Sequence, residues 1–148
     1  MAKVISSTPR MTVDRFLAWL DDGPEGMRYE LVAGEVVAMA PERAAHARLK
    51  ARIWRALDSQ IAERGLSCEA LPDGMTVKID EHTAYEPDAV LHCGASLADD
   101  ALLVPEPVIV VEVLSPTTKA HDAGAKLAAI SAWRACVITS SCGPSRGR

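Results

Sequence analysis

The sequence of 148 residues has no long apolar run. Apolar stretches such as residues 108–111 are far shorter than the roughly 20 residues that a helix needs to cross a bilayer. The N-terminus also lacks the continuous apolar core that is typical of a secretory signal. We therefore expect a protein without membrane contact that is located in the cytoplasm.

Closely spaced cysteine pairs are absent as well. The four cysteines, at positions 68, 93, 136 and 142, form no Cys-x-x-Cys motif. Zinc knuckles and thioredoxin-like redox sites are built from such motifs, so neither class of site is supported. We expect reduced thiols, as is usual in a cytoplasm.

Acidic residues do not occur after position 122, whereas the last 18 residues carry three arginines. The rest of the chain is therefore more acidic than the net charge of −4 suggests. An acidic domain binds polyanions poorly in general, so a nucleic-acid function would need a local basic surface. The composition, 49% apolar and 24% charged, is that of a folded protein.

Hydrophobic periodicity and turn signals predict an α+β fold. Thr12 is placed to cap a short helix, and Ala33-Gly34 is placed to connect the two strands of a hairpin. The two-residue turn would put Glu30 and Glu35 on one face of this hairpin. The expected elements are a helix from 12 to about 20, hairpin strands at 29–32 and 35–39, a long helix over 42–64, strands at 66–71, 75–79, 85–91 and 107–114, and a helix over 119–133.

The strand expected at 107–114 is apolar at both parities and yet contains Glu112. A carboxylate in a strand covered on both faces must be protonated, paired with a cation or bound to a metal. Asp88 opens another apolar segment, so the two acids could meet on neighbouring strands and share Mg²⁺ or Mn²⁺. The alternatives are a structural ion pair between Glu112 and an arginine, and a solvated loop position for Asp88.

Several segments together resemble the Uma-two family of putative restriction endonucleases, a branch of the PD-(D/E)XK nuclease-like superfamily. The matching segments are Tyr-Glu-Leu-Val-Ala-Gly-Glu at 29–35, His46, Glu-Pro-Asp-Ala-Val at 86–90, Pro-Val-Ile-Val-Val-Glu-Val-Leu-Ser-Pro at 107–116, and Asp122 with Lys126. The resemblance implies a restriction-endonuclease-like mixed β-sheet flanked by helices, preceded by a short helix and a β-hairpin.

The resemblance also implies a phosphodiesterase site in which Asp88 and Glu112 bind Mg²⁺ or Mn²⁺. The superfamily places a lysine two residues after the glutamate, where this chain has Leu114. Lys126, in the following helix, is the position that matches the displaced lysine, and Glu30 is expected as a further catalytic carboxylate. Residues expected to support the site are Glu35, His46 and Asp122.

These supporting assignments have simpler alternatives. Asp122 and Lys126 could form an exposed i,i+4 ion pair worth about 0.3–0.5 kcal/mol. Glu30 and Glu35 could lie on a solvated hairpin face. His46 shares the apolar arc of its helix, where a histidine is most often part of the core.

A basic stripe on the long helix is the expected nucleic-acid surface. Arg48, Arg52 and Arg55 fall within about 60° of one another at helical periodicity. They could contact phosphates, which positions a duplex without reading its sequence. The alternative is that they are ordinary solvated charges.

We expect one nuclease-like domain over 12–133 and an atypical tail over 134–148. The composition break in the tail suggests a different reading frame or a truncated product. An incomplete sheet edge would favour a homodimer or larger assembly. The leading function is a metal-dependent endonuclease acting on DNA. The alternatives are a catalytically inactive nuclease-fold module that binds nucleic acid or protein, and an inert gene fragment.

Overall fold

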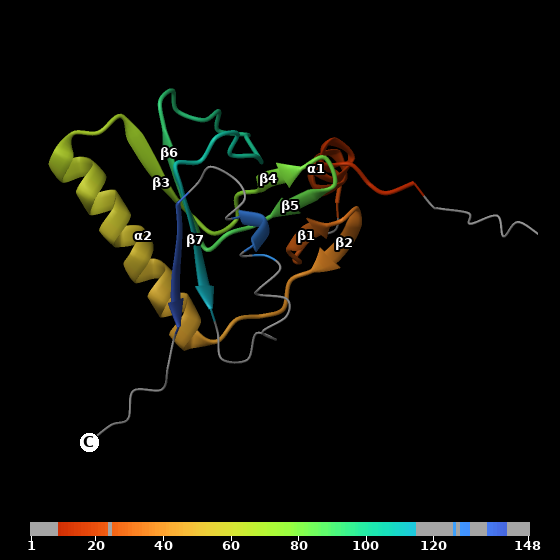
Figure 1. Cartoon of the computed structure of the whole chain (residues 1–148), viewed down its shortest axis with the longest axis horizontal. Coiled ribbons are helices and arrows are strands. Elements are labelled where there is room, and N and C mark those ends of the chain that lie inside the picture. The colour runs from red at the N-terminus through yellow and green to blue at the C-terminus, as the bar shows by residue number, and fades with distance from the viewer. Residues whose placement is uncertain (1–8, 24, 115–125, 127, 131–135, 142–148) are drawn as a thin grey trace, which may run out of the picture.

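Two four-stranded sheets organise the chain in the computed structural model (Figure 1). The structure describes residues 9–23, 25–114, 126 and 128–130, and the backbone of 136–141. The strand order is β2-β1-β5-β4 in one sheet and β3-β6-β7-β8 in the other. The elements are α1 (Val13–Asp21), β1 (Tyr29–Val32), β2 (Glu35–Ala38), α2 (Ala44–Arg64), β3 (Cys68–Pro72), β4 (Val77–Asp80), β5 (Thr83–Tyr85), β6 (Ala89–Cys93), β7 (Ile109–Leu114) and β8 (Cys136–Ser141).

The N-terminal helix and hairpin form as their sequence signals predict. The Thr12 side chain accepts a hydrogen bond from the backbone N–H of Arg15 at 3.4 Å and caps α1. Val32 pairs with Glu35 across the turn, which is the predicted register. Both turn residues have positive φ, 51° at Ala33 and 84° at Gly34, as a tight two-residue hairpin turn requires.

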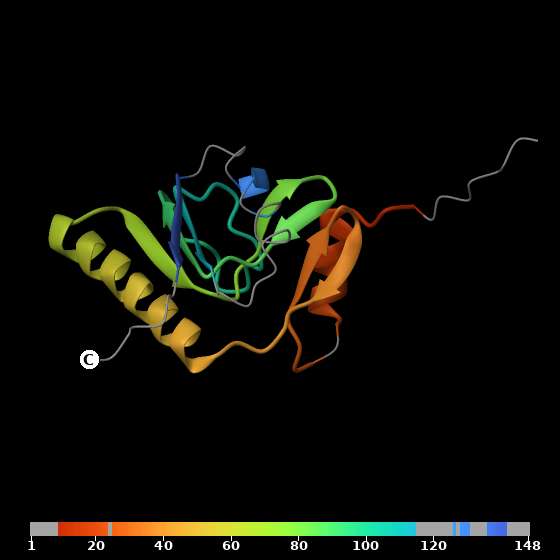
Figure 2. The ribbon, with the colours of Figure 1, turned by 60° about the horizontal axis from the view of Figure 1, so that its bottom comes forward.

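The long helix α2 lies against the second sheet. It ends at Gly65, whose φ of 59° is the left-handed conformation that glycine adopts readily. Trp54 anchors the helix, because its indole N–H donates to the carbonyl of Ala70 in β3 at 2.8 Å. Figure 2 shows α2 beside β3 at one side of the molecule and the hairpin β1–β2 at the other.

The single strand expected at 85–91 is instead two strands in different sheets. β5 pairs with β1 and β4, whereas β6 pairs with β3 and β7. Glu86, Pro87 and Asp88 form the crossing between them. Proline has no N–H to donate to a strand ladder, so the chain leaves one sheet there and enters the other. This crossing places Asp88 at the start of β6.

β7 is a buried strand of the second sheet. Val110, Val111 and Val113 are all less than 5% exposed, which confirms that both faces are covered. β8 runs parallel to β7 at the sheet edge, within the segment that the sequence marked as an atypical tail. Of the helix expected at 119–133, Lys126 and residues 128–130 are helical, and the other positions lie outside the described residues. Most of the tail over 134–148 also lies outside them.

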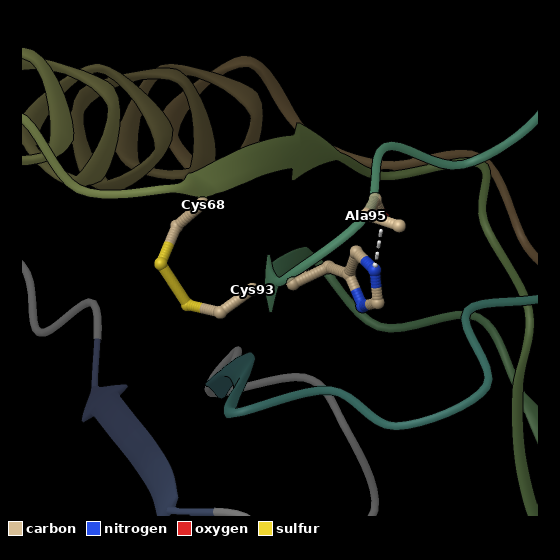
Figure 3. Close-up of a disulfide and its surroundings, with 4 residues drawn as sticks. Cys68, Cys93 and Ala95 are labelled. Atoms are coloured by element: carbon tan, nitrogen blue, oxygen red, sulfur yellow. Dashed lines mark hydrogen bonds between the residues drawn. A yellow bond between two sulfur atoms is a disulfide. The ribbon is translucent and has the colours of Figure 1, made fainter.

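The expectation of reduced thiols is wrong for Cys68 and Cys93, which form a disulfide (Figure 3). The antiparallel pairing of β3 with β6 places these two residues directly opposite one another. Their separation of 25 residues gave no sign of this pairing. Reduced thiols therefore no longer support the expected cytoplasmic location. Among the described helices, none is both long and apolar enough to cross a bilayer.

Candidate functional site

The pairing of β6 with β7 brings Asp88 and Glu112 together. Ala89 pairs with Val111, so the same antiparallel register places the preceding Asp88 opposite Glu112. The backbone N–H of Asp88 donates to the Val111 carbonyl at 2.9 Å. The side chain of Asp88 accepts a bond from the N–H of Val113 at 2.5 Å. These two backbone contacts fix the Asp88 carboxylate beside β7.

Glu112 is a buried carboxylate, with a side chain that is 11% exposed. Burial raises its pKa to about 7, because desolvation outweighs the attraction of Lys126, and the charge of Asp88 adds to the rise. Within the described residues, Oε1 of Glu112 accepts no well-directed hydrogen bond. The Lys126 ammonium nevertheless lies 3.0 Å from this oxygen and forms an ion pair with it.

Lys126 joins the C-terminal helical residues to the hairpin. Its Nζ donates to Oε1 of Glu30 at 2.6 Å and lies 5.1 Å from the ring centroid of Tyr85. Burial alone would lower the pKa of Lys126, but the charges of Glu112 and Glu30 outweigh it and raise the pKa above its ordinary value. The lysine therefore stays charged between two carboxylates.

The two hairpin glutamates have different positions. Glu30 points into the site, where Oε1 also accepts the backbone N–H of Glu86 at 2.9 Å. Glu35 is exposed at the turn end of the hairpin, and the structure does not bring it to the site. The two residues share a face, but β1 and β2 carry them to opposite ends of it. Asp122 lies outside the described residues.

Helix α2 contributes His46 to the site. Its Nε2 lies 3.4 Å from Oδ1 of Asp88 and 3.6 Å from Oε2 of Glu42. The histidine thus faces protein, as its periodicity predicted, and it contacts a candidate metal ligand. Arg48, Arg52 and Arg55 lie on the exposed side of the same helix.

Sequence reasoning missed Lys50, which lies between the arginines of the predicted basic stripe on the same helix. Lys50 is 7% exposed, and its Nζ lies 2.6 Å from Oδ2 of Asp73. The same atom lies 2.8 Å from Oε2 of Glu42 and 3.6 Å from Oδ1 of Asp88. The available signal was its i,i+4 spacing from His46, which places both side chains on one helix face.

Arg28, just before β1, was also missed. Its guanidinium contacts Oδ2 of Asp73 at 2.7 Å and the carboxylate of Glu86. Burial would raise the pKa of Asp73, but the neighbouring Lys50 and Arg28 hold it below its ordinary value. Asp73 therefore stays ionised between two cations.

A family model confirms the assignment that the sequence motifs suggested. The Uma2 model, described as "Putative restriction endonuclease", matches residues 13–131. The chain belongs to the Uma2 family. An uncharacterized protein of Synechocystis sp. is 26% identical over 119 residues, which are 80% of this chain and 60% of that protein. This Uma2 chain thus spans less than two thirds of the curated relative that it matches.

A solved structure shows the same fold. The crystal structure of a putative nuclease from Anabaena variabilis, belonging to DUF820, aligns with a TM-score of 0.67 at 15% identity. The alignment covers 88% of this chain and 74% of that one. The predicted nuclease-like α+β fold is therefore confirmed.

Asp88 and Glu112 fit a divalent ion of the Mg²⁺ type. Such ions take oxygen ligands, keep several waters and are commonly held by one or two carboxylates. The buried Oε1 of Glu112 has the Lys126 ammonium as an ion-pair partner but makes no directed hydrogen bond within the described residues, so this carboxylate keeps lone pairs for a further cation. Within the part of the chain that the structure describes, no group of three His, Cys, Asp or Glu side chains is arranged to hold a metal. The residues thus fit a two-carboxylate site whose remaining ligands are water.

Proposed function

We propose that this Uma2 protein is an endonuclease that hydrolyses DNA phosphodiester bonds with Mg²⁺ or Mn²⁺ held by Asp88 and Glu112. The observation that carries the proposal is the buried Glu112 carboxylate, which lies opposite Asp88 and 3.0 Å from the Lys126 ammonium. Burying two acids with one lysine lowers the stability of the fold, because charged groups lose their hydration. Such groups are common at sites that act on phosphates.

The roles of the side chains follow from their contacts. A bound divalent ion would polarise a phosphate oxygen and lower the pKa of a water molecule. Lys126 would orient the attacking water or neutralise charge on the phosphate, because its ammonium is already fixed at the site. Glu30 holds that ammonium at 2.6 Å, and the N–H of Val113 holds Asp88. His46 and Lys50 support Asp88 from α2.

The exposed arginines of α2 are the proposed DNA contacts. Arg48, Arg52 and Arg55 lie on the exposed side of α2, about 180–240° round the helix axis from His46, so a duplex held by them would lie along the outer face of this helix. The overall charge of −4 is unfavourable for DNA, which makes such a local basic surface necessary. Replacing all three with alanine should weaken DNA binding and reduce its salt dependence.

The test is cleavage of supercoiled plasmid and linear duplex DNA with Mg²⁺ or Mn²⁺. We expect nicking or cutting by the natural sequence and loss of that activity in Glu112→Ala. The matched control is Glu106→Ala, which removes an exposed carboxylate close to β7. Single-stranded RNA in parallel reactions distinguishes a ribonuclease. Absence of metal-dependent cleavage, or unchanged cleavage by Glu112→Ala, contradicts the proposal.

The second candidate is a binding module that keeps the fold without catalysis. It is favoured by the lack of a three-ligand metal cluster among the described residues and by the acidic net charge. Calorimetry separates the two functions. Tight DNA or protein binding that is unaffected by EDTA and by Asp88→Asn would support the module.

We also propose that the chain forms a homodimer or larger assembly. β2 is an edge strand in the described sheets, and its Val36 and Val37 are 37% and 45% exposed. An exposed apolar edge strand favours pairing with another chain. Light scattering that reports a monomer at high concentration would contradict this.

A further inference from the structure

Lys50 lies among carboxylate and imidazole side chains, which are types that commonly bind metal ions. Its Nζ lies 2.6 Å from Asp73, 2.8 Å from Glu42 and 3.6 Å from Asp88. The imidazole of His46 lies within 3.6 Å of both Glu42 and Asp88. Three carboxylates thus surround a single ammonium that is almost inaccessible to solvent, and one imidazole contacts two of these carboxylates.

We propose that Lys50 is a built-in cation that excludes a second divalent ion from the position beside Asp88. This inference rests on the proposed function, because Asp88 is there a ligand of the first ion. The inference adds that the proposed active site uses one divalent ion and not two.

The placement of Lys50 supports this role. In two-metal sites the ions are about 3.5–4 Å apart and are bridged at the reacting phosphate. A second ion beside Asp88 would need further oxygen ligands on the side away from Glu112. In this chain those oxygens belong to Glu42 and Asp73, and both are already bound by Lys50.

Arg28 does not duplicate the function of Lys50. Its guanidinium contacts the same Oδ2 of Asp73 but extends from there to Glu86. Removing the Lys50 ammonium would therefore leave Glu42 and Asp88 without a lysine or arginine partner among the described residues, and Asp73 with Arg28 alone. In the natural sequence the carboxylates are arranged around the ammonium, and no three such side chains of the described residues are arranged to hold a metal. Without the ammonium, carboxylate oxygens with an imidazole are a suitable ligand set for Mn²⁺.

The test counts Mn²⁺ ions bound per chain, by calorimetry and by the loss of the free-ion paramagnetic resonance signal. We expect one ion for the natural sequence and two for Lys50→Ala. Lys50→Arg retains a cation and should still bind one ion. Arg64→Ala, at the far end of α2, removes the same net charge from an exposed position and should also bind one. Two ions bound by the natural sequence, or no additional ion in Lys50→Ala, would overturn the inference.

The result remains informative if Lys50→Ala folds poorly. Added Mn²⁺ should then restore its circular dichroism and raise its Tm more than that of Lys50→Arg, because the ion replaces the missing ammonium. No such preferential rescue would overturn the inference. Failure of the proposed function gives a different result, namely a natural sequence that binds no Mn²⁺. In that case, an ion gained by Lys50→Ala would still support the role of Lys50.

Discussion

Replacing Glu112 with glutamine should stabilise the fold at pH 8 in the absence of metal. The pKa of Glu112 is raised from 4.5 to about 7 because burial penalises the ionised form more than Lys126 stabilises it. A shift of one pKa unit corresponds to 1.36 kcal/mol. The rise in the pKa of Glu112 therefore lowers the free energy of unfolding by about 3 kcal/mol at most. Glutamine keeps the shape of the side chain without the charge, and Lys126 retains Glu30 as a partner.

The sign of the pH dependence follows from which state loses its proton first. Below pH 4.5 both the folded and the unfolded chain keep Glu112 protonated, and this residue contributes no penalty. Between 4.5 and about 7 the unfolded chain ionises first, so the free energy of unfolding of the natural sequence falls as pH rises. The advantage of Glu112→Gln should therefore be near zero at pH 4.5 and reach its maximum above pH 7.

The assay is urea denaturation followed by circular dichroism between pH 4.5 and 8 in EDTA. The difference in free energy of unfolding between Glu112→Gln and the natural sequence is the measured quantity. Glu106→Gln, at an exposed position, should show a difference that does not vary over this range. If Glu112→Gln is equally or less stable than the natural sequence at pH 8, burial does not dominate the energetics of this carboxylate and the reasoning fails.

Three further predictions concern the metal, the turn and the disulfide. Mg²⁺ at 100 times its Kd should stabilise the natural sequence by about 2.7 kcal/mol in thermal unfolding, and Asp88→Asn should lose this effect. Ala33→Asn should raise the free energy of unfolding by about 0.5–1 kcal/mol, since φ is 51° at a position where asparagine is less strained. A decrease would contradict it. Replacing both Cys68 and Cys93 with serine should cost about 3 kcal/mol for a separation of 25 residues, and an unchanged denaturation midpoint would show that the bond is not formed in solution.

Local patterns in the sequence were sufficient for most of the elements. The cap at Thr12 and the two-residue turn at Ala33-Gly34 each depend on neighbouring residues, and both have the expected geometry. The strand break at Pro87 was missed, because an apolar run does not reveal that its two halves pair in different sheets.

The sequence also named Asp88, Glu112, Lys126 and Glu30 as candidates, since an acid in an apolar strand is unusual and the family motif names its partners. The structure brings these four side chains together. The sequence could not identify Lys50, because a lysine in a basic helix is normally solvated. Lys50 is buried because the helix packs on a sheet whose turn supplies Asp73.

The sequence by itself thus predicted most of the elements and named the candidate site residues. Only the tertiary structure decided which charges meet. Glu30, Glu112 and Lys126 are separated by up to 96 residues, and their contact depends on how the hairpin packs against β7. The disulfide between Cys68 and Cys93 likewise depends on strand register. Periodicity reports which face of an element is buried, whereas long-range ion pairs arise from the packing of separate elements.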